Sequence, residues 1–324
     1  MLYKDRVYRD IELNDKLVLD IINSKAFQRL KEINQHAISS FIMPKMDITR
    51  FEHCIGVYLL LKKLGADYEE QIAGLLHDIS QTAMSHVQDF LFNRENHDYH
   101  EEHFERILTE SEIPEILEKN NVSSKNILNQ EKYTLLENEY PDLCADRVDY
   151  FYRDCLMYGL LTKEGVDNSL NNLRIFNNEI VFNDKDSAHF FATAYIKANK
   201  EMWSNTMHIF WYNVMAGIME IGLKHNIITE NDFFLTDTLV YNKLKSSNNH
   251  EIKERFKLLN TNISLISDKK NFDFHLKPKP RIVDPKIMVN NQLVRLSQLD
   301  GKYKEEMDKY KKELEQGYFV RIIK

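Results

Sequence analysis

The chain has 324 residues, of which 43% are hydrophobic and 29% charged, with nine glycines and six prolines. This composition is typical of a globular, mostly helical protein and excludes a largely disordered one. The formal net charge of −7 argues against general binding to a nucleic-acid backbone, because such proteins usually present a basic surface.

Two further features bear on where the protein works. The three cysteines, Cys54, Cys144 and Cys155, form neither a CxxC pair nor a disulfide framework. The amino-terminal segment lacks the apolar core of a signal peptide, and no apolar run is long enough to cross a bilayer. We therefore predict a soluble cytoplasmic protein without a membrane span.

Amphipathic helices are predicted through most of the first two thirds of the chain. Apolar residues recur at three- and four-residue spacing from about residue 14 to residue 222, which gives each helix one apolar face. The segments with the clearest spacing are residues 16–35, 56–65, 69–80, 99–111 and 146–161.

A short hairpin interrupts these helices. Two β-type runs flank Asn177 and Asn178, a pair that tolerates the positive φ of a tight turn. Another helical region is predicted over residues 188–224.

The character of the sequence changes near residue 226. Prolines, β-branched residues and a second Asn-Asn pair follow, and residues 302–317 have the charge pattern of a solvated amphipathic helix. We expect a mainly α protein, with a helical domain over residues 1–225 and a smaller α+β appendage over residues 226–324 packed on it.

Histidine and aspartate residues lie at the ends of predicted apolar helices. His53 lies in TRFEHCIGV, His77 and Asp78 end the run GLLHD, and Asp146 begins DRVDYFYRD. Imidazole nitrogens and carboxylate oxygens together suit divalent ions such as Mn, Fe, Mg, Zn or Ni. Because helix ends can converge on one point, these residues are candidate metal ligands.

Helical geometry limits how these residues can act. Neighbouring residues project about 100° apart on a helix, so His77 and Asp78 can share one ion only where their helix ends. Asp146, Tyr150 and Asp154 recur at every fourth position and are expected along one helix face.

A dipeptide alone is weak evidence for a metal site, since a buried histidine is more often a satisfied core group. The sequence contains no HExxH motif, no Glu-x-x-His pair and no glycine-rich phosphate loop. His97, His100 and His103, at three-residue spacing, could form a separate metal cluster.

Four blocks occur in a specific order: AFQRLKEINQ, TRFEHCIGV, LLHDISQTAMSH and ADRVDYFYRDC. In this the chain resembles the HD-domain phosphohydrolase superfamily, and within it the deoxynucleoside triphosphate triphosphohydrolase branch, over about residues 13–160. The resemblance implies a helical HD core and a divalent metal ion. The metal ligands that it implies are His53, His77, Asp78 and Asp146.

The resemblance also implies how the substrate is held. Arg50 and Arg147 match positions that contact phosphate, and Tyr150 and Asp154 match residues near the sugar. The implied reaction is metal-assisted hydrolysis of a deoxynucleotide into a deoxynucleoside and triphosphate.

Proton transfer is assigned by the same resemblance. His86 matches the catalytic histidine of the branch, and Asp89 could orient its imidazole if the segment is helical. His100 and Glu101 match a second histidine-carboxylate pair that lines the pocket.

Two departures from the branch pattern bear on the substrate. Gln81 stands where a histidine is usual; it can hydrogen-bond to phosphate but cannot transfer a proton near neutral pH. Residues 195–210 contain Lys197, Lys200 and Trp203 but no arginine to hold a triphosphate.

These departures leave alternatives open. The same site could serve a nucleotide monophosphatase, pyrophosphatase or phosphodiesterase, or the chain could be a nucleotide-binding HD module without turnover. The expected partner is a small nucleotide rather than a membrane or a nucleic acid. A homo-oligomer is also expected, because the branch commonly assembles through helices.

Overall fold

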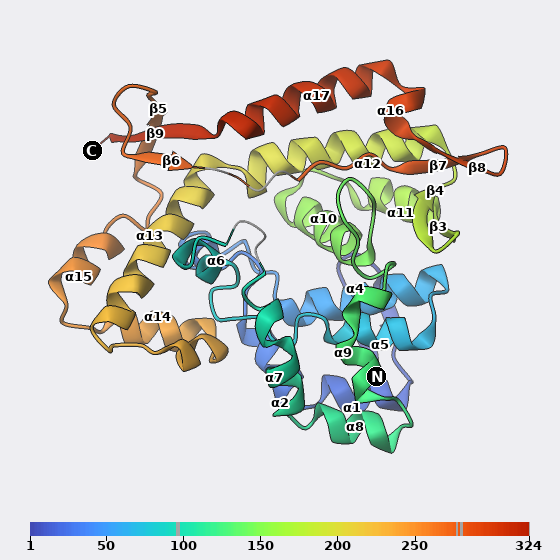
Figure 1. Cartoon of the computed structure of the whole chain (residues 1–324), viewed down its shortest axis with the longest axis horizontal. Coiled ribbons are helices and arrows are strands. Elements are labelled where there is room, and N and C mark those ends of the chain that lie inside the picture. The colour runs from blue at the N-terminus through green and yellow to red at the C-terminus, as the bar shows by residue number, and fades with distance from the viewer. Residues whose placement is uncertain (95–97, 277, 279–280, 324) are drawn as a thin grey trace.

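The computed structural model describes residues 1–94, 98–276, 278 and 281–323, and within them shows a mainly helical protein with three small sheets (Figure 1). The predicted mainly α fold is confirmed. His97, a member of the possible three-histidine cluster, lies outside the described residues.

Three helices form the centre of the molecule: α4 (Arg50–Leu64), α5 (Tyr68–Leu76) and α10 (Ala145–Tyr158), of which α4 packs against both others. The hydroxyl of Thr49 caps α4 by accepting the N–H of Glu52 at 3.2 Å. Most of helix α4 is buried, so the side chains of Arg50 and His53 in its first turn are enclosed by the protein.

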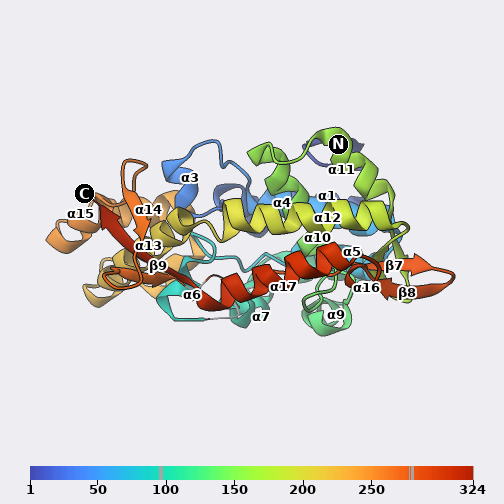
Figure 2. The ribbon, with the colours of Figure 1, turned by 90° about the horizontal axis from the view of Figure 1, so that it is seen from above.

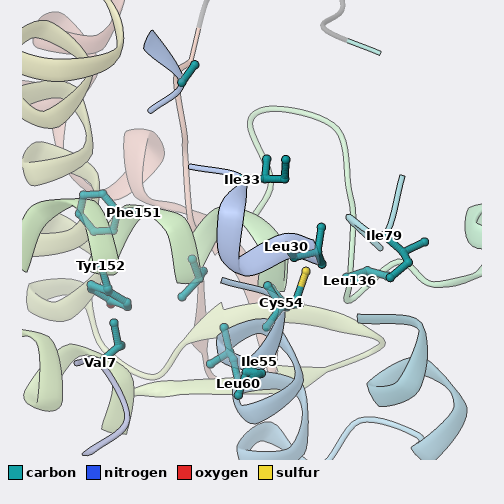
Figure 3. Close-up of a cluster of buried hydrophobic side chains, with 14 of the residues drawn as sticks. Val7, Leu30, Ile33, Cys54, Ile55, Leu60, Ile79, Leu136, Phe151 and Tyr152 are labelled. Carbon is teal, nitrogen blue, oxygen red and sulfur yellow. The ribbon is translucent and has the colours of Figure 1, made fainter. Parts of the chain in front are cut away.

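The buried apolar side chains around these helices form one continuous core. Figure 3 shows part of it, with Cys54, Ile55 and Leu60 of α4 and Phe151 and Tyr152 of α10 all fully buried. Burial of this apolar area is the main favourable contribution to folding, and it fixes where the polar residues of α4 and α10 can lie.

The helix predicted over residues 16–35 is in fact broken. The structure has α1 (Lys16–Ile22), α2 (Lys25–Arg29) and a 3₁₀ turn, η1 (Leu30–Glu32). The break falls at Ser24, whose hydroxyl accepts the N–H of Phe27 at 3.2 Å and so starts a new helix. The remaining short helical elements of this region are α3 (Ile38–Ile42), α6 (Val87–Leu91), η2 (Glu101–His103), α7 (Phe104–Thr109), α8 (Ile113–Lys119), α9 (Ser124–Leu128), η3 (Gln130–Lys132) and α11 (Lys163–Asn171).

The hairpin predicted after α11 is confirmed. Strands β3 (Leu173–Phe176) and β4 (Glu179–Phe182) pair antiparallel, and Asn177 and Asn178 have φ values of 51° and 59°. A second antiparallel hairpin, β7 (Lys286–Val289) with β8 (Gln292–Arg295), joins it through a parallel contact between β4 and β7. At the amino terminus, β1 (Leu2–Asp5) pairs with β2 (Arg9–Glu12).

The helical region predicted over residues 188–224 is interrupted. Helix α12 (Lys185–Ala198) is followed by a π-helical turn, η4 (Asn199–Trp203), and then by α13 (Thr206–Lys224). The buried amide of Asn199 hydrogen-bonds to the hydroxyl of Ser204 and to the carbonyl oxygen of Arg281. These contacts compete with the regular helical pattern, and π-helical turns often mark functional sites.

The carboxy-terminal region packs on the core rather than standing apart. Helices α14 (Asp237–Lys245) and α15 (His250–Phe256) lie against α13, and α17 (Gly301–Gln316) runs alongside α12 (Figures 1 and 2). The boundary predicted at residue 226 stays a prediction. The other elements of this region are η5 (Glu230–Phe234), β5 (Ser264–Ser267), β6 (Phe274–Leu276), α16 (Leu296–Leu299) and β9 (Tyr318–Ile323), with the sheet order β5-β9-β6.

Within the described part of the chain, every helix is too short or too polar to cross a membrane. The predicted cytoplasmic location and the predicted homo-oligomer stay predictions.

Candidate metal centre

The ends of α4, α5 and α10 bring three predicted ligands together. His53 lies in the first turn of α4, His77 directly follows α5, and Asp146 lies in the first turn of α10. The Oδ1 atom of Asp146 is 2.9 Å from Nε2 of His53 and 3.5 Å from Nε2 of His77. These three ligand atoms lie within 4.8 Å of one another, so one ion could contact all of them.

The tautomer of His77 leaves one nitrogen available for a metal. Its Nδ1 donates a hydrogen bond to the carbonyl oxygen of Gly74 at 2.8 Å. Its Nε2 is the nitrogen that remains for a metal, and this buried atom lies 3.5 Å from Oδ1 of Asp146 without a hydrogen bond to any described residue. A buried polar atom without a partner is costly, and a divalent ion would satisfy it. This nitrogen, beside the His53 and Asp146 ligand atoms, shows that the site fits such an ion.

His53 is held by a carboxylate that the sequence interpretation missed. Its Nδ1 donates to Oδ2 of the fully buried Asp149 at 2.8 Å, which leaves Nε2 facing Asp146. Burial alone would lower the pKa of His53, but the hydrogen bonds with Asp146 and Asp149 outweigh burial and raise it. The position between His53 and Asp146 therefore attracts positive charge.

Asp149 belongs to a buried ionic network. The guanidinium of Arg153 donates to Asp149 at 2.8 and 3.0 Å, to Asp5 at 3.1 Å and to Glu52 at 2.8 Å. The network leaves no space for a side chain at Gly56, where a Cβ would lie 2.0 Å from the Arg153 guanidinium. The only signal for it in the sequence is an Asp/Arg pair at i, i+4 within an otherwise apolar stretch of α10.

Asp78 lies beside the same centre but is engaged by Arg50. Its Oδ2 atom is 4.0 Å from Nε2 of His53 and 3.8 Å from Nε2 of His77, and only 2.6 Å from Nη1 of Arg50. Burial would raise the pKa of Asp78, but Arg50 and His77 hold it well below its ordinary value. The carboxylate is thus ionised and could be shared between Arg50 and an ion.

Arg50 connects this carboxylate to the predicted proton donor. Its Nη2 donates to Nε2 of His86 at 3.1 Å, and Nδ1 of His86 donates to Oδ2 of Asp89 at 2.9 Å. His86 immediately precedes α6, so the helical geometry expected for the His86 and Asp89 pair is present. The predicted phosphate-binding arginine therefore contacts both Asp78 and His86.

His100 and Gln81 approach Asp78 from its other oxygen. Nε2 of His100 lies 3.5 Å from Oδ1 of Asp78, and Nε2 of Gln81 donates to the same atom at 3.3 Å. The His100 ring centre is 5.7 Å from that of His86. Gln81 is fully buried, whereas Glu101 is exposed on η2.

The residues predicted to hold the nucleotide lie farther along α10. Arg147 stacks on Tyr140, with 3.9 Å from its guanidinium carbon to the ring centre, and donates to the carbonyl oxygen of Asn138 at 2.9 Å. The hydroxyls of Tyr150 and Tyr195 are in contact, and each of them lies 3.0 Å from the hydroxyl of Tyr140. Arg147 and Tyr150 do not touch the three converging ligands.

Asp154 has partners from two other segments. It accepts the indole N–H of Trp203 at 2.7 Å and the amide of Gln35 at 3.2 Å, and its Oδ1 lies 3.1 Å from Nε2 of His36. Eight residues separate Asp154 from Asp146, or about 12 Å along the helix axis. This span along one helix is comparable to the length of a nucleotide.

A second group of possible ligands shares Asp146. Glu137 and Cys144 each offer an atom within 4.8 Å of Asp146 and of each other. Glu137 is exposed, and the Cys144 thiol lies 3.7 Å from its carboxylate. The His53, His77 and Asp146 group is more enclosed and has the unpartnered nitrogen, so it is the stronger candidate.

The site lies within the part of the chain that matches a known family. The family model described as HD domain matches residues 50–151, which include all four predicted ligands. The chain is 35% identical over 311 residues to the uncharacterised protein YdhJ of Bacillus subtilis, covering 96% of each protein. It is 34% identical over 233 residues to metal-dependent phosphohydrolase cns2 of Cordyceps militaris, covering 68% of this chain and 67% of that protein.

Two further comparisons are more distant. Deoxynucleoside triphosphate triphosphohydrolase SAMHD1 of Gallus gallus is 26% identical over 214 residues, covering 49% of this chain and 34% of that enzyme. The crystal structure of a hypothetical protein from Aquifex aeolicus matches with a TM-score of 0.68 and 19% identity, over 97% of this chain and 99% of that one. The second likeness concerns the fold alone.

Proposed function

Since this chain belongs to the HD-domain family and is a metal-dependent phosphohydrolase, we propose that it hydrolyses deoxynucleoside triphosphates to a deoxynucleoside and triphosphate. The observation that carries the proposal is the unpartnered Nε2 of His77 beside His53 and Asp146. The assignment of a triphosphate as substrate is supported by the sequence resemblance and by Arg50 and Arg147, which lie near the site.

In the proposed reaction, His53, His77, Asp78 and Asp146 would hold the divalent ion. When bound, such an ion acidifies water and polarises a phosphoryl oxygen. Asp149 keeps the His53 imidazole oriented with Nε2 toward the centre.

Proton transfer is proposed for His86. Asp89 fixes its Nδ1–H, so Nε2 is the nitrogen that would take up a proton released from the attacking water and pass it to the departing oxygen. That nitrogen now accepts a hydrogen bond from Arg50. A phosphate group that drew the Arg50 guanidinium toward itself would free Nε2 and place positive charge next to the developing negative charge.

A second candidate function is hydrolysis of a nucleotide with fewer phosphates, by a monophosphatase, pyrophosphatase or phosphodiesterase reaction. Two observations favour it. Gln81 hydrogen-bonds to Asp78 and cannot replace a proton-transferring histidine, and residues 195–210 supply no arginine. The same two observations also favour a third possibility, a module that binds a nucleotide without hydrolysing it.

The test is hydrolysis of a nucleotide panel with several divalent metals, with product analysis and measurement of the metal content. Release of triphosphate supports the proposal, whereas orthophosphate or pyrophosphate supports the second candidate. His77→Ala should abolish both hydrolysis and metal binding, and His250→Ala, at a histidine exposed on α15, should change neither. Full activity in His77→Ala would exclude the metal centre. Tight nucleotide binding without any product would indicate the module.

A further inference from the structure

An arginine from outside the HD-domain match lies among the aromatic residues of the proposed nucleotide site. Arg281 precedes β7, and its guanidinium carbon lies 5.9 Å from the centre of the Trp203 ring. The side chain of Asn199 donates to its carbonyl oxygen at 3.0 Å. Both contacts come from the π-helical turn between α12 and α13, so that turn fixes where Arg281 enters the site.

Arg281 has no acidic partner among the described residues. Two other arginines of the same region are paired, Arg295 with Asp142 at 2.7 Å and Arg321 with Asp268 at 3.7 Å. The Trp203 ring that it faces lies 5.2 Å from the ring centre of Tyr150 and 5.0 Å from that of Tyr195, so Arg281 borders the tyrosine cluster. The guanidinium is half-buried, and with no carboxylate beside it, it favours an anion that completes its hydrogen bonds.

Arg147 faces the same phenols. Its guanidinium stacks on Tyr140, whose hydroxyl lies 3.0 Å from those of Tyr150 and Tyr195. Its hydrogen bonds go to main-chain carbonyl oxygens, its Nε has no partner among the described residues, and the exposed carboxylate of Glu137 is 3.6 Å away. Two cations thus lie against one cluster of three linked hydroxyls.

We infer that Arg281 is a specificity-determining residue that binds the phosphates beyond the one attacked, together with Arg147 and the hydroxyls of Tyr140 and Tyr195. Guanidinium and phenol groups are hydrogen-bond donors that suit phosphate oxygens. Arg147 and Tyr150 lie one and four residues after Asp146 on α10, so the cluster is next to the metal centre but separate from it. The inference rests on the proposed function.

Arg281 also explains a feature of the sequence. Residues 195–210 lack the arginine expected for triphosphate binding, yet the π-helical turn in that segment binds the main chain of Arg281. The missing cation comes from a segment about 80 residues later in the chain. The packed core holds this segment in place, which offsets the entropy cost of closing so long a loop. The carboxy-terminal region therefore completes the substrate site.

The test compares Arg281→Gln with wild type on a deoxynucleoside triphosphate, the matching monophosphate and p-nitrophenyl phosphate. Loss of one charged contact to phosphate should raise KM for the triphosphate by about 10- to 100-fold. The KM values for the two single-phosphate substrates should not change. Arg281→Lys should have a KM for the triphosphate between those of wild type and Arg281→Gln. Arg321→Ala, at the exposed pair with Asp268, is the matched control and should behave as wild type.

Binding measurements separate this inference from the proposed function. Calorimetric titration with inorganic triphosphate needs no turnover, so weaker binding in Arg281→Gln supports the inference even if wild type releases no triphosphate. An equal loss of affinity for the triphosphate and the monophosphate in Arg281→Gln would overturn the inference. An unchanged affinity for triphosphate would also overturn it. Thermal unfolding of each variant shows whether it folds. If Arg281→Gln does not fold, the triphosphate affinity of Arg281→Lys decides the question. Wild-type protein that binds no triphosphate would overturn both proposals.

Discussion

Oδ2 of Asp149 lies 2.8 Å from Nδ1 of His53, and both groups are buried. The hydrogen bond fixes the ring orientation and directs Nε2 toward Asp146. Carboxylates in this position make an imidazole a better metal ligand. The affinity of the centre for its metal thus depends on Asp149, a residue that does not face the ion.

We predict that Asp149→Asn lowers metal affinity by about 10- to 100-fold while the protein still folds. The amide can still accept the His53 hydrogen bond, but it lacks the charge that strengthens the ligand. Metal titration against a competing chelator measures the effect. Asp308→Asn, at an exposed carboxylate on α17, should bind metal as wild type does. Wild-type affinity in Asp149→Asn would contradict this role.

His86→Ala should reduce kcat by about 10²- to 10⁴-fold, the usual contribution of a positioned acid or base. The metal content should not change, because His86 contacts Arg50 and Asp89 rather than the three converging ligands. Steady-state kinetics with elemental analysis tests both statements. His225→Ala, at an exposed histidine after α13, is the control. Loss of metal together with activity would show that His86 acts through the centre's structure.

Arg153→Ala should lower the free energy of unfolding by about 3–5 kcal/mol, because it leaves buried carboxylates without their cation. The carboxylates concerned are Asp5, Glu52 and Asp149. Arg153→Lys keeps the charge but loses the forked geometry, so a smaller loss is expected. Urea denaturation at neutral pH compares the three proteins. Equal stability of Arg153→Ala and wild type would mean that the network contributes nothing net.

Asp237 is expected to make stability depend on pH. Burial raises its pKa to about 7, although the N–H groups of Asn34 and Met84 and the charges of Arg29 and Arg50 oppose the shift. The folded state therefore retains a proton that the unfolded state has lost, and this contribution is complete below about pH 4 and is lost as pH rises toward 7. Unfolding free energies of wild type should fall more steeply over that interval than those of Asp237→Asn.

The same aspartate also supports the segment before His86. Its carboxylate accepts the N–H of Met84 at 2.6 Å and that of Asn34 at 2.8 Å, and Met84 and Ser85 both have positive φ. An asparagine has one acceptor oxygen, so Asp237→Asn should also cost about 1–3 kcal/mol at pH 7. Unchanged stability at every pH would contradict both statements.

The sequence was informative where local rules decide the structure. His53, His77 and Asp146 could be placed at helix ends from apolar periodicity, and helix ends can converge. The Asn177-Asn178 turn follows from backbone preference alone. The break at Ser24 also has a local signal, a serine able to cap a helix, which the prediction from apolar spacing did not use.

Contacts between distant segments could not be predicted. Asp149 and Arg153 are ordinary surface residue types, and only the packing of β1 and α4 against α10 encloses them. Arg281 reaches Trp203, beside the tyrosine cluster, and Asn199 binds its main chain, a contact that no periodicity indicates. The engagement of Arg50 by Asp78 and His86 likewise depends on three segments meeting.

The ionic network links the first strand of the protein to its metal centre. Asp5 at the end of β1 binds Arg153, which binds Asp149, which orients His53. An affinity tag fused at the amino terminus, or proteolytic removal of β1, would therefore disturb the orientation of His53 through these three successive contacts. For purification, a carboxy-terminal tag beyond β9 is the choice that leaves this relay undisturbed.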